Sequence, residues 1–444
     1  MKKNIISVVA ILSLLLVAIN LSDPLRFMAM DMPETPQECS NFSVNHGDKV
    51  FFGSIDDKAP DKLAAGEAYI KVYPPNAAGF GYAEFGYWYP QDRIWSRNGA
   101  LNESSLAYGT MSVPSLPLNP HPEKRIRGFD NFFNQLMRKT VSVEEAIQLA
   151  QQSDFSDLGD KMAFQIQLAD ATGDSVVISP GVDGDLVFTR KPRDVTYLMS
   201  TNFNSGVMEH IKGENINAYE RYDTAIALLT QITAAKDLSE VSARQVLDAV
   251  HMEAWPSFAS SSRVFDLHSG DIYLYYYAQY DDGVRLNLAE EFKKGHQEIR
   301  MRDLFPQETA ERGESLYQAV RVRETTTVLL FITAVALFVG NLIAFLVVKI
   351  RAWKKSATNE SSRRGQVYFC LSGISWAAAS WCLLLFLINT YPPNLIHPVY
   401  PIQAKWVLGP SGALGAITAI LAVIRLQRAQ LSQKTAMEKK KHEN

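Results

Sequence analysis

The feature that most restricts the fold is the uneven distribution of apolar residues along the chain. Three long apolar runs lie near the C-terminus, at 326–349, 367–389 and 406–425. A helix needs roughly 20 apolar residues to cross a bilayer. The sequence therefore predicts a three-helix transmembrane region, followed by a basic cytoplasmic tail at 426–444.

A shorter apolar segment lies at the N-terminus. Residues 1–22 begin with a lysine pair and are typical of a signal peptide or a membrane anchor. Basic residues follow the first and third C-terminal runs, whereas the loop at 391–405 carries a single lysine. By the positive-inside rule, the basic segments are cytoplasmic. The sequence thus predicts a multi-pass membrane protein that has the lipid bilayer as a partner. The domain at 39–323 is then extracytoplasmic, either periplasmic or extracellular.

This domain has the pattern of a mixed fold. Strands separated by turn sequences are expected at 163–168, 175–178 and 186–188, and helices at 141–152 and 218–235. Runs of strands with helices grouped between them indicate the α+β class. The formal net charge of −3 gives no indication of a nucleic-acid partner. Metalloprotease, redox and phosphate-loop motifs are missing from the sequence, so we expect no cofactor and no metal.

One cysteine lies in this domain. Cys39 precedes a predicted hairpin, whereas Cys370 and Cys382 fall in the second apolar run, so no disulfide can form within the domain. A lone thiol of this kind either is reactive or is buried and inert, and composition leaves both open. The aromatic stretch that contains Tyr87 and Trp88 has a similar ambiguity. It lines an apolar ligand pocket or packs as a core strand.

The order of short segments in the domain resembles a known enzyme family. Cys-x-x-Phe followed by "KVFFGSIDD" is similar to the opening hairpin of the choloylglycine hydrolase and penicillin V acylase-like linear amide C–N hydrolases. "NESSLAYGTMSVP", "STNF", "YERYDTA" and "VFDLHSGDIYLYYY" follow in the family's order, over about Cys39 to Phe305. The resemblance implies a four-layer α-β-β-α N-terminal nucleophile hydrolase sandwich, which the three-helix transmembrane region would follow.

The resemblance also implies a chemistry. The chain would be cut between Glu38 and Cys39, which makes 23–38 a propeptide and Cys39 the mature N-terminus. A free α-amine titrates near about 8 and can accept the thiol proton, so one residue supplies both nucleophile and base. Asp57 would then hold the α-amine, Asn202 would donate to the oxyanion, and Arg221 would complete the polar network.

Two positions depart from the family pattern. Ser54 stands where bile-salt hydrolases carry an arginine, and Ser112 stands where an oxyanion-side asparagine is common. Substrate contacts are expected from Ser112, Tyr87 and Trp88.

The resulting hypothesis is a membrane-anchored cysteine amidase that hydrolyses the linear amide bond of a small N-acyl substrate, with the oligomeric state open. The alternative is a catalytically silent acyl-amide-binding membrane receptor or assembly domain.

Overall fold

The structure is a computed structural model that describes residues 39–58, 60–207, 216–254 and 257–319, together with the single helical positions Ile343, Gly373 and Ala378. The chain divides into two units, Met1–Tyr317 and Gln318–Asn444. The strands and helices given below belong to the first unit.

The first sheet carries the start of the described chain. Its strand order is β12-β1-β2-β14-β15-β16, with β13 paired to β14, and every pairing is antiparallel. β1 and β2 form a hairpin around Gly47, whose positive φ of 64° suits a residue without a side chain. The strands are β1 (Ser40–His46), β2 (Lys49–Lys58), β12 (Tyr197–Ser200), β13 (Glu253–Ala254), β14 (Ser257–Asp266), β15 (Asp271–Tyr276) and β16 (Val284–Asn287).

The second sheet has eight strands in the order β11-β10-β9-β6-β5-β4-β3-β17. The strands expected at 163–168, 175–178 and 186–188 fall within β9, β10 and β11. A separate short parallel pair joins β7 (Ile126–Arg127) to β8 (Ser153–Asp154). The strands of the sheet are β3 (Glu67–Tyr73), β4 (Tyr82–Tyr89), β5 (Ile94–Asn102), β6 (Ala107–Pro117), β9 (Lys161–Ala169), β10 (Ser175–Pro180), β11 (Leu186–Arg190) and β17 (Gln297–Arg300).

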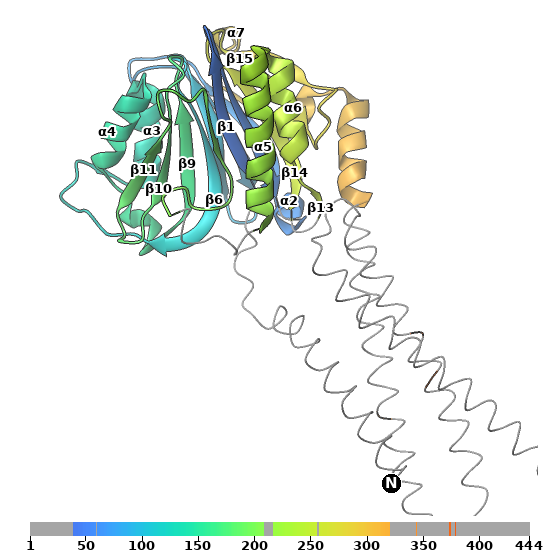
Figure 1. Cartoon of the computed structure of the whole chain (residues 1–444), viewed down its shortest axis with the longest axis horizontal. Helices are drawn as coiled ribbons and strands as arrows, with labels where there is room; N and C mark the ends of the chain where they lie inside the picture. The colour runs from blue at the N-terminus through green and yellow to red at the C-terminus, as the bar shows by residue number, and fades with distance from the viewer. Residues whose placement is uncertain are drawn as a thin grey trace, which may run out of the picture. The chain divides into compact units, whose positions relative to one another are not determined.

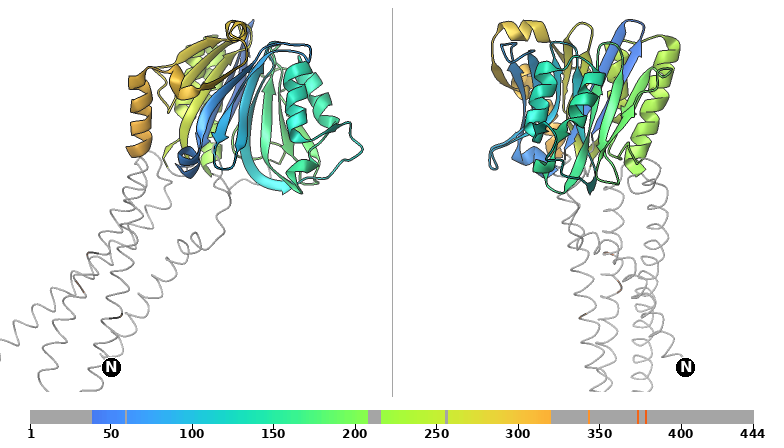
Figure 2. Two further views of the ribbon diagram at one scale, coloured as in Figure 1. Left: turned by 180° about the vertical axis from the view of Figure 1, so that it is seen from behind. Right: turned by 90° about the vertical axis from the view of Figure 1, so that its left-hand side faces the viewer.

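The two sheets face each other, and helices cover their outer faces (Figures 1 and 2). α3 (Phe129–Lys139) and α4 (Val143–Gln151) bury an apolar cluster against the second sheet, while α5 (Ile216–Ala235) and α6 (Glu240–Val250) bury another against the first. The described part of the first unit is therefore a mixed α/β sandwich in which each sheet buries an apolar cluster against its own helices. The described residues also form α2 (Pro60–Ala65), α7 (Leu288–Lys293), the 3-10 turns Ser156–Leu158 and Met301–Leu304, and a helix that begins at Gln307.

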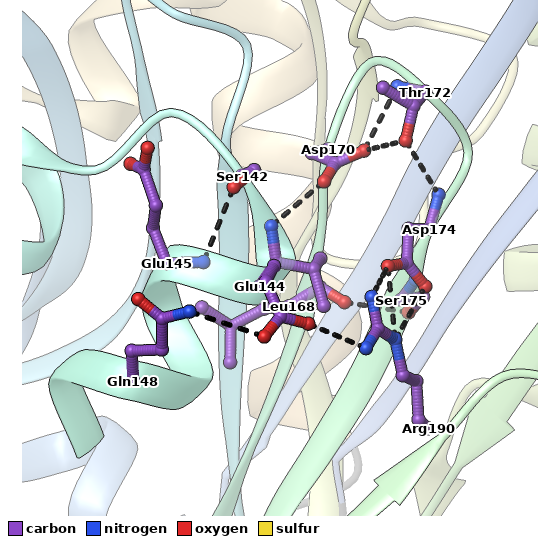
Figure 3. Close-up of polar contacts among 11 residues, drawn as sticks. Ser142, Glu144, Glu145, Gln148, Leu168, Asp170, Thr172, Asp174, Ser175 and Arg190 are labelled. Carbon is purple, nitrogen blue, oxygen red and sulfur yellow. Dashed lines mark hydrogen bonds and ion pairs between the residues drawn. The ribbon is translucent and has the colours of Figure 1, made fainter. Parts of the chain in front are cut away.

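The start of α4 shows how side chains tie the outer helices to the sheets. Ser142 Oγ accepts a hydrogen bond from the backbone N of Glu145 at 3.2 Å, which is the usual N-cap interaction (Figure 3). The carboxylate of Asp170, in the turn after β9, accepts from the backbone N of Val143 at 2.8 Å. Arg190 of β11 pairs with Glu144. These contacts fix α4 on the second sheet.

The predicted fold class and localisation need correction. In the part of the chain that the structure describes, no helix is long and apolar enough to cross a membrane. The predicted three-helix transmembrane region and the multi-pass membrane localisation are therefore not supported. The prediction uses only the apolar runs and the distribution of basic residues around them, and neither pattern by itself specifies a spanning helix. The segments at 1–38 and 426–444 lie outside the described residues. So do the runs at 326–349, 367–389 and 406–425, apart from three single positions.

Candidate active site

Cys39 lies directly before β1, at the end of the hairpin away from its turn. Its side chain is buried, and its Sγ lies 4.0 Å from the backbone O of Asp57 on the neighbouring strand β2. Ser40 pairs with Ile55, and the Ser40 hydroxyl contacts a helix on the outer face of the sheet. Because successive side chains of a strand alternate between faces, the Cys39 side chain lies on the face toward the second sheet.

Arg221 of α5 ties the beginning of β1 to a loop of the same sheet. Its Nη1 donates to the backbone O of Cys39 at 3.1 Å and to Ser40 Oγ at 2.6 Å. Its Nη2 donates to Asn202 Oδ1 at 2.7 Å, and its Nε to Asn217 Oδ1 at 2.8 Å. One buried guanidinium therefore orients both the nucleophile candidate and the predicted oxyanion donor.

Asn202 follows β12 and connects the two sheets. Its Nδ2 donates to the backbone O of Ser112, in β6 of the second sheet, at 2.9 Å. Ser112 thus enters the site through its carbonyl group. The carboxylate of Asp57 is fully buried, and its Oδ1 accepts from the backbone N of Met252 at 3.4 Å. The structure brings Cys39, Asp57, Asn202 and Arg221 together, and their catalytic roles remain predictions.

The electrostatic environment keeps the Cys39 thiol protonated at neutral pH. Burial raises the pKa of Cys39 to about 12, since a thiolate loses its hydration there. The ammonium of Lys58 lowers this pKa, whereas the carboxylates of Asp56 and Asp57 raise it further. A nucleophilic Cys39 therefore needs a base and a source of positive charge close by.

Comparison with solved structures finds chains similar to this one. Two of them are variants of the conjugated bile acid hydrolase from Clostridium perfringens, 13% and 14% identical to this chain, each with a TM-score of 0.45. Each comparison covers 59% of this chain and 95% of the other chain. No protein-family model matches the chain, and no curated protein matches it. At these sequence identities and TM-scores, the similarity to the solved structures assigns neither a family nor a substrate to this chain.

A buried ion pair lies between the sheets beside the site. Arg263 of β14 donates from Nη1 to Asp56 Oδ2 at 2.6 Å, and from Nη2 to Ser54 Oγ and the backbone O of Asn98, both at 2.9 Å. Burial acts to raise the pKa of Asp56, but Arg263 and Lys58 outweigh it and hold that pKa below its ordinary value. Sequence patterns do not reveal this pair. The only available signal is a lone basic residue, Arg263, in a strand made mostly of serine and apolar residues.

The loop that carries Asn202 is held by a glutamine of the second sheet. Gln165 of β9 donates from Nε2 to the backbone O of Thr201 at 2.8 Å and of Phe203 at 3.0 Å. Its Oε1 accepts from the backbone N of Ser205 at 3.0 Å. These bonds bracket Asn202 on both sides. Gln165 alternates with apolar residues in β9, a pattern that predicts a solvent-facing side chain, so the sequence gives no signal of its burial.

The two aromatic residues predicted to bind substrate lie on opposite faces of β4. Tyr87 is buried between the sheets, where the Nζ of Lys58 lies 5.2 Å from its ring centroid. Trp88, the next residue, is half-buried and pairs across the strands with Trp95. Tyr87 therefore lies on the inner face, as Cys39 does, and Trp88 lies on the outer one. Among the described residues, no group of three or more His, Cys, Asp or Glu side chains could hold a metal ion.

Proposed function

We propose that this protein is a cysteine amidase that hydrolyses the linear amide bond of a small N-acyl substrate. Cys39 is the nucleophile and becomes an N-terminal residue when the chain is cut between Glu38 and Cys39. The observation that carries the proposal is the hydrogen bonding of Arg221 to the Cys39 carbonyl and to Asn202, at the first residue of a hairpin. The buried carboxylate of Asp57 lies on the neighbouring strand.

The chemistry follows from these groups. The free α-amine takes the thiol proton, and the ammonium so formed is stabilised by the carboxylate of Asp57. The thiolate attacks the amide carbonyl carbon, and the carbonyl oxygen becomes an oxyanion. Asn202 has two N–H donors on its amide, and one of them is bonded to Ser112 O. In the proposed mechanism the side-chain amide of Asn202 also donates to the oxyanion.

The second half of the reaction releases the acid. The ammonium returns its proton to the leaving amine as the C–N bond breaks, which leaves a thioester on Cys39. Water then attacks the thioester carbon, with the α-amine again accepting a proton, and the carboxylic acid departs as the thiol re-forms. Nucleophile, base and acid are all supplied by Cys39, and its neighbours orient them.

N-terminal sequencing and intact mass of the purified protein test this proposal. We expect a chain that begins at Cys39 and a hydrolytic activity toward at least one member of a panel of N-acyl amides. Cys39→Ala should abolish that activity. A chain with an intact Glu38–Cys39 bond has no α-amine at Cys39, and this result would contradict the mechanism. The catalytically silent acyl-amide-binding domain would then be the better explanation.

A further inference from the structure

Lys58 is a buried lysine beside the candidate nucleophile. It is the last residue of β2, and its side chain is 1% exposed. Lysines are almost never buried to this extent unless their charge is compensated. Its Nζ lies 3.5 Å from Oδ1 of Asn98 and 5.2 Å from the ring centroid of Tyr87. Asn98 and Tyr87 belong to the second sheet, so the ammonium lies between the two sheets.

The strand register puts Cys39 and Lys58 on the same face of the hairpin. Ser40 is opposite Ile55, and continuing this register by one residue puts Cys39 opposite Asp56. Lys58 is then the diagonal neighbour of Cys39, at two residues beyond Asp56. Diagonal neighbours on one face of a sheet are about 7–8 Å apart, which is within reach of a long side chain.

The other charges near Cys39 do not replace this ammonium. Asp56 would oppose a thiolate, but its carboxylate is bonded by Arg263. The guanidinium of Arg221 is directed at the backbone O of Cys39 and at Asn202. Lys58 is the leading source of positive charge that lowers the pKa of the Cys39 thiol. A charge in a buried region acts more strongly than the same charge in water.

We propose that Lys58 is a positioning residue for Cys39, and that its buried ammonium stabilises the Cys39 thiolate. The inference rests on the proposed function in taking Cys39 as the nucleophile. Lys58 forms no bond to substrate. The thiol proton goes to the α-amine of Cys39. The ammonium of Lys58 then stabilises the resulting thiolate until the thiolate attacks the carbonyl carbon. The aromatic face of Tyr87 and the amide of Asn98 hold the ammonium in place.

The test measures the protonation of Cys39 without a substrate. Full-length wild-type protein, Lys58→Met and Lys58→Arg are reacted with iodoacetamide over a series of pH values, and labelling of the Cys39 peptide is followed by mass spectrometry. Only the thiolate reacts, so the rate against pH gives the pKa of the thiol. We expect Lys58→Met to raise the midpoint by about one pH unit or more, which slows labelling about tenfold at pH values below it. Lys58→Arg should retain the wild-type profile.

Lys49→Met is the matched control, because Lys49 lies on the same strand and its Nζ donates to the backbone O of Leu238. It should leave the profile unchanged. An unchanged profile in a folded Lys58→Met protein, or an Arg variant that behaves like the Met variant, would overturn the proposal. Circular dichroism establishes folding. If Lys58→Met does not fold, Lys58→Gln repeats the test with the donor to Asn98 retained.

The mass measurement on the same samples separates this inference from the proposed function. An intact Glu38–Cys39 bond removes the amidase mechanism, yet the labelling midpoint still reports whether Lys58 stabilises the thiolate. A cut chain with no Lys58 effect leaves the amidase proposal in place and rejects the role of Lys58.

Discussion

At the scale of single residues, the site depends on the shape of one guanidinium. Arg221 bonds the carbonyl of Cys39, the hydroxyl of Ser40 and the amide of Asn202 from a single buried position. An arginine presents five donors in a planar fork, whereas a lysine offers one ammonium on a flexible stem. Positive charge alone therefore cannot maintain this set of contacts.

We expect Arg221→Lys to reduce the free energy of unfolding by about 1.5–3 kcal/mol, the usual size of hydrogen bonds to a charged group. We also expect kcat on an N-acyl amide to fall about 100-fold, because Asn202 loses the bond that orients its donor. Urea unfolding and steady-state kinetics measure the two effects. Arg300→Lys changes an exposed arginine that pairs with the exposed Glu67, and it should alter the free energy of unfolding by no more than about 0.5 kcal/mol. Wild-type kcat in Arg221→Lys would contradict the orienting role.

At the scale of elements, local pattern predicts hairpins and caps but not which distant strands pair. Turn sequences and alternation locate β9, β10 and β11, and Ser142 and Glu145 have the spacing of a capping box, which predicts the start of α4. In a capping box the Glu145 carboxylate would accept from the backbone N of Ser142, but in the structure it accepts from the backbone N of Val141. Strands β2 and β14 are central neighbours although their residues are about 200 positions apart. Such pairings are set by the packing of the whole sheet, so a short stretch of sequence does not predict them.

The loop after β12 is the element on which the oxyanion donor depends. Gln165→Leu would remove the partners of the Thr201 and Phe203 carbonyls and of the Ser205 amide, all close to Asn202. Each buried group left without a bond costs about 1–3 kcal/mol, so we expect the free energy of unfolding to fall by at least about 2 kcal/mol.

Gln167→Leu is the matched variant, since Gln167 is also buried in β9 but bonds the Leu198 carbonyl and the Ser200 hydroxyl, before Asn202. Both variants should lose stability in urea unfolding. We expect only Gln165→Leu to lower kcat on an N-acyl amide at a temperature where both proteins remain folded. An equal loss of kcat in the two would show that Gln165 has no particular effect on Asn202.

At the scale of the whole molecule, the site is assembled from both sheets, and this limits what the sequence can predict. Cys39 stands out as a lone thiol, and the resemblance to amide hydrolases leads to Asp57, Asn202 and Arg221. The buried charges of Lys58 and Arg263 cannot be predicted in the same way. Lys58 ends a strand and Arg263 lies inside one, and neither position tells from sequence whether the charge is solvated or buried. Both buried charges therefore become visible only when the sheets are stacked.

The pair of Arg263 and Asp56 makes the stacking of the sheets dependent on pH. Arg263 joins Asp56 of the first sheet to the backbone O of Asn98 in the second. The pKa of Asp56 is lower in the folded protein than its ordinary value. The ionised form of Asp56 therefore stabilises the fold at pH values above about 3.9, the pKa of an aspartate in an unfolded chain. This contribution is lost as the pH falls through the lower pKa that Asp56 has in the folded protein.

Asp56→Asn keeps the shape of the side chain and removes its charge, which leaves the Arg263 guanidinium buried without its carboxylate. We expect the free energy of unfolding near neutral pH to fall by about 3–5 kcal/mol, as measured by urea unfolding. The difference from wild type should shrink at pH values below the folded pKa of Asp56, because wild-type Asp56 is then uncharged as well. Asp281→Asn is the control, since Asp281 is almost fully exposed in its pair with Arg244, and it should change the free energy by no more than about 1 kcal/mol. If Asp56→Asn unfolds with the wild-type free energy near neutral pH, the buried pair does not hold the two sheets together.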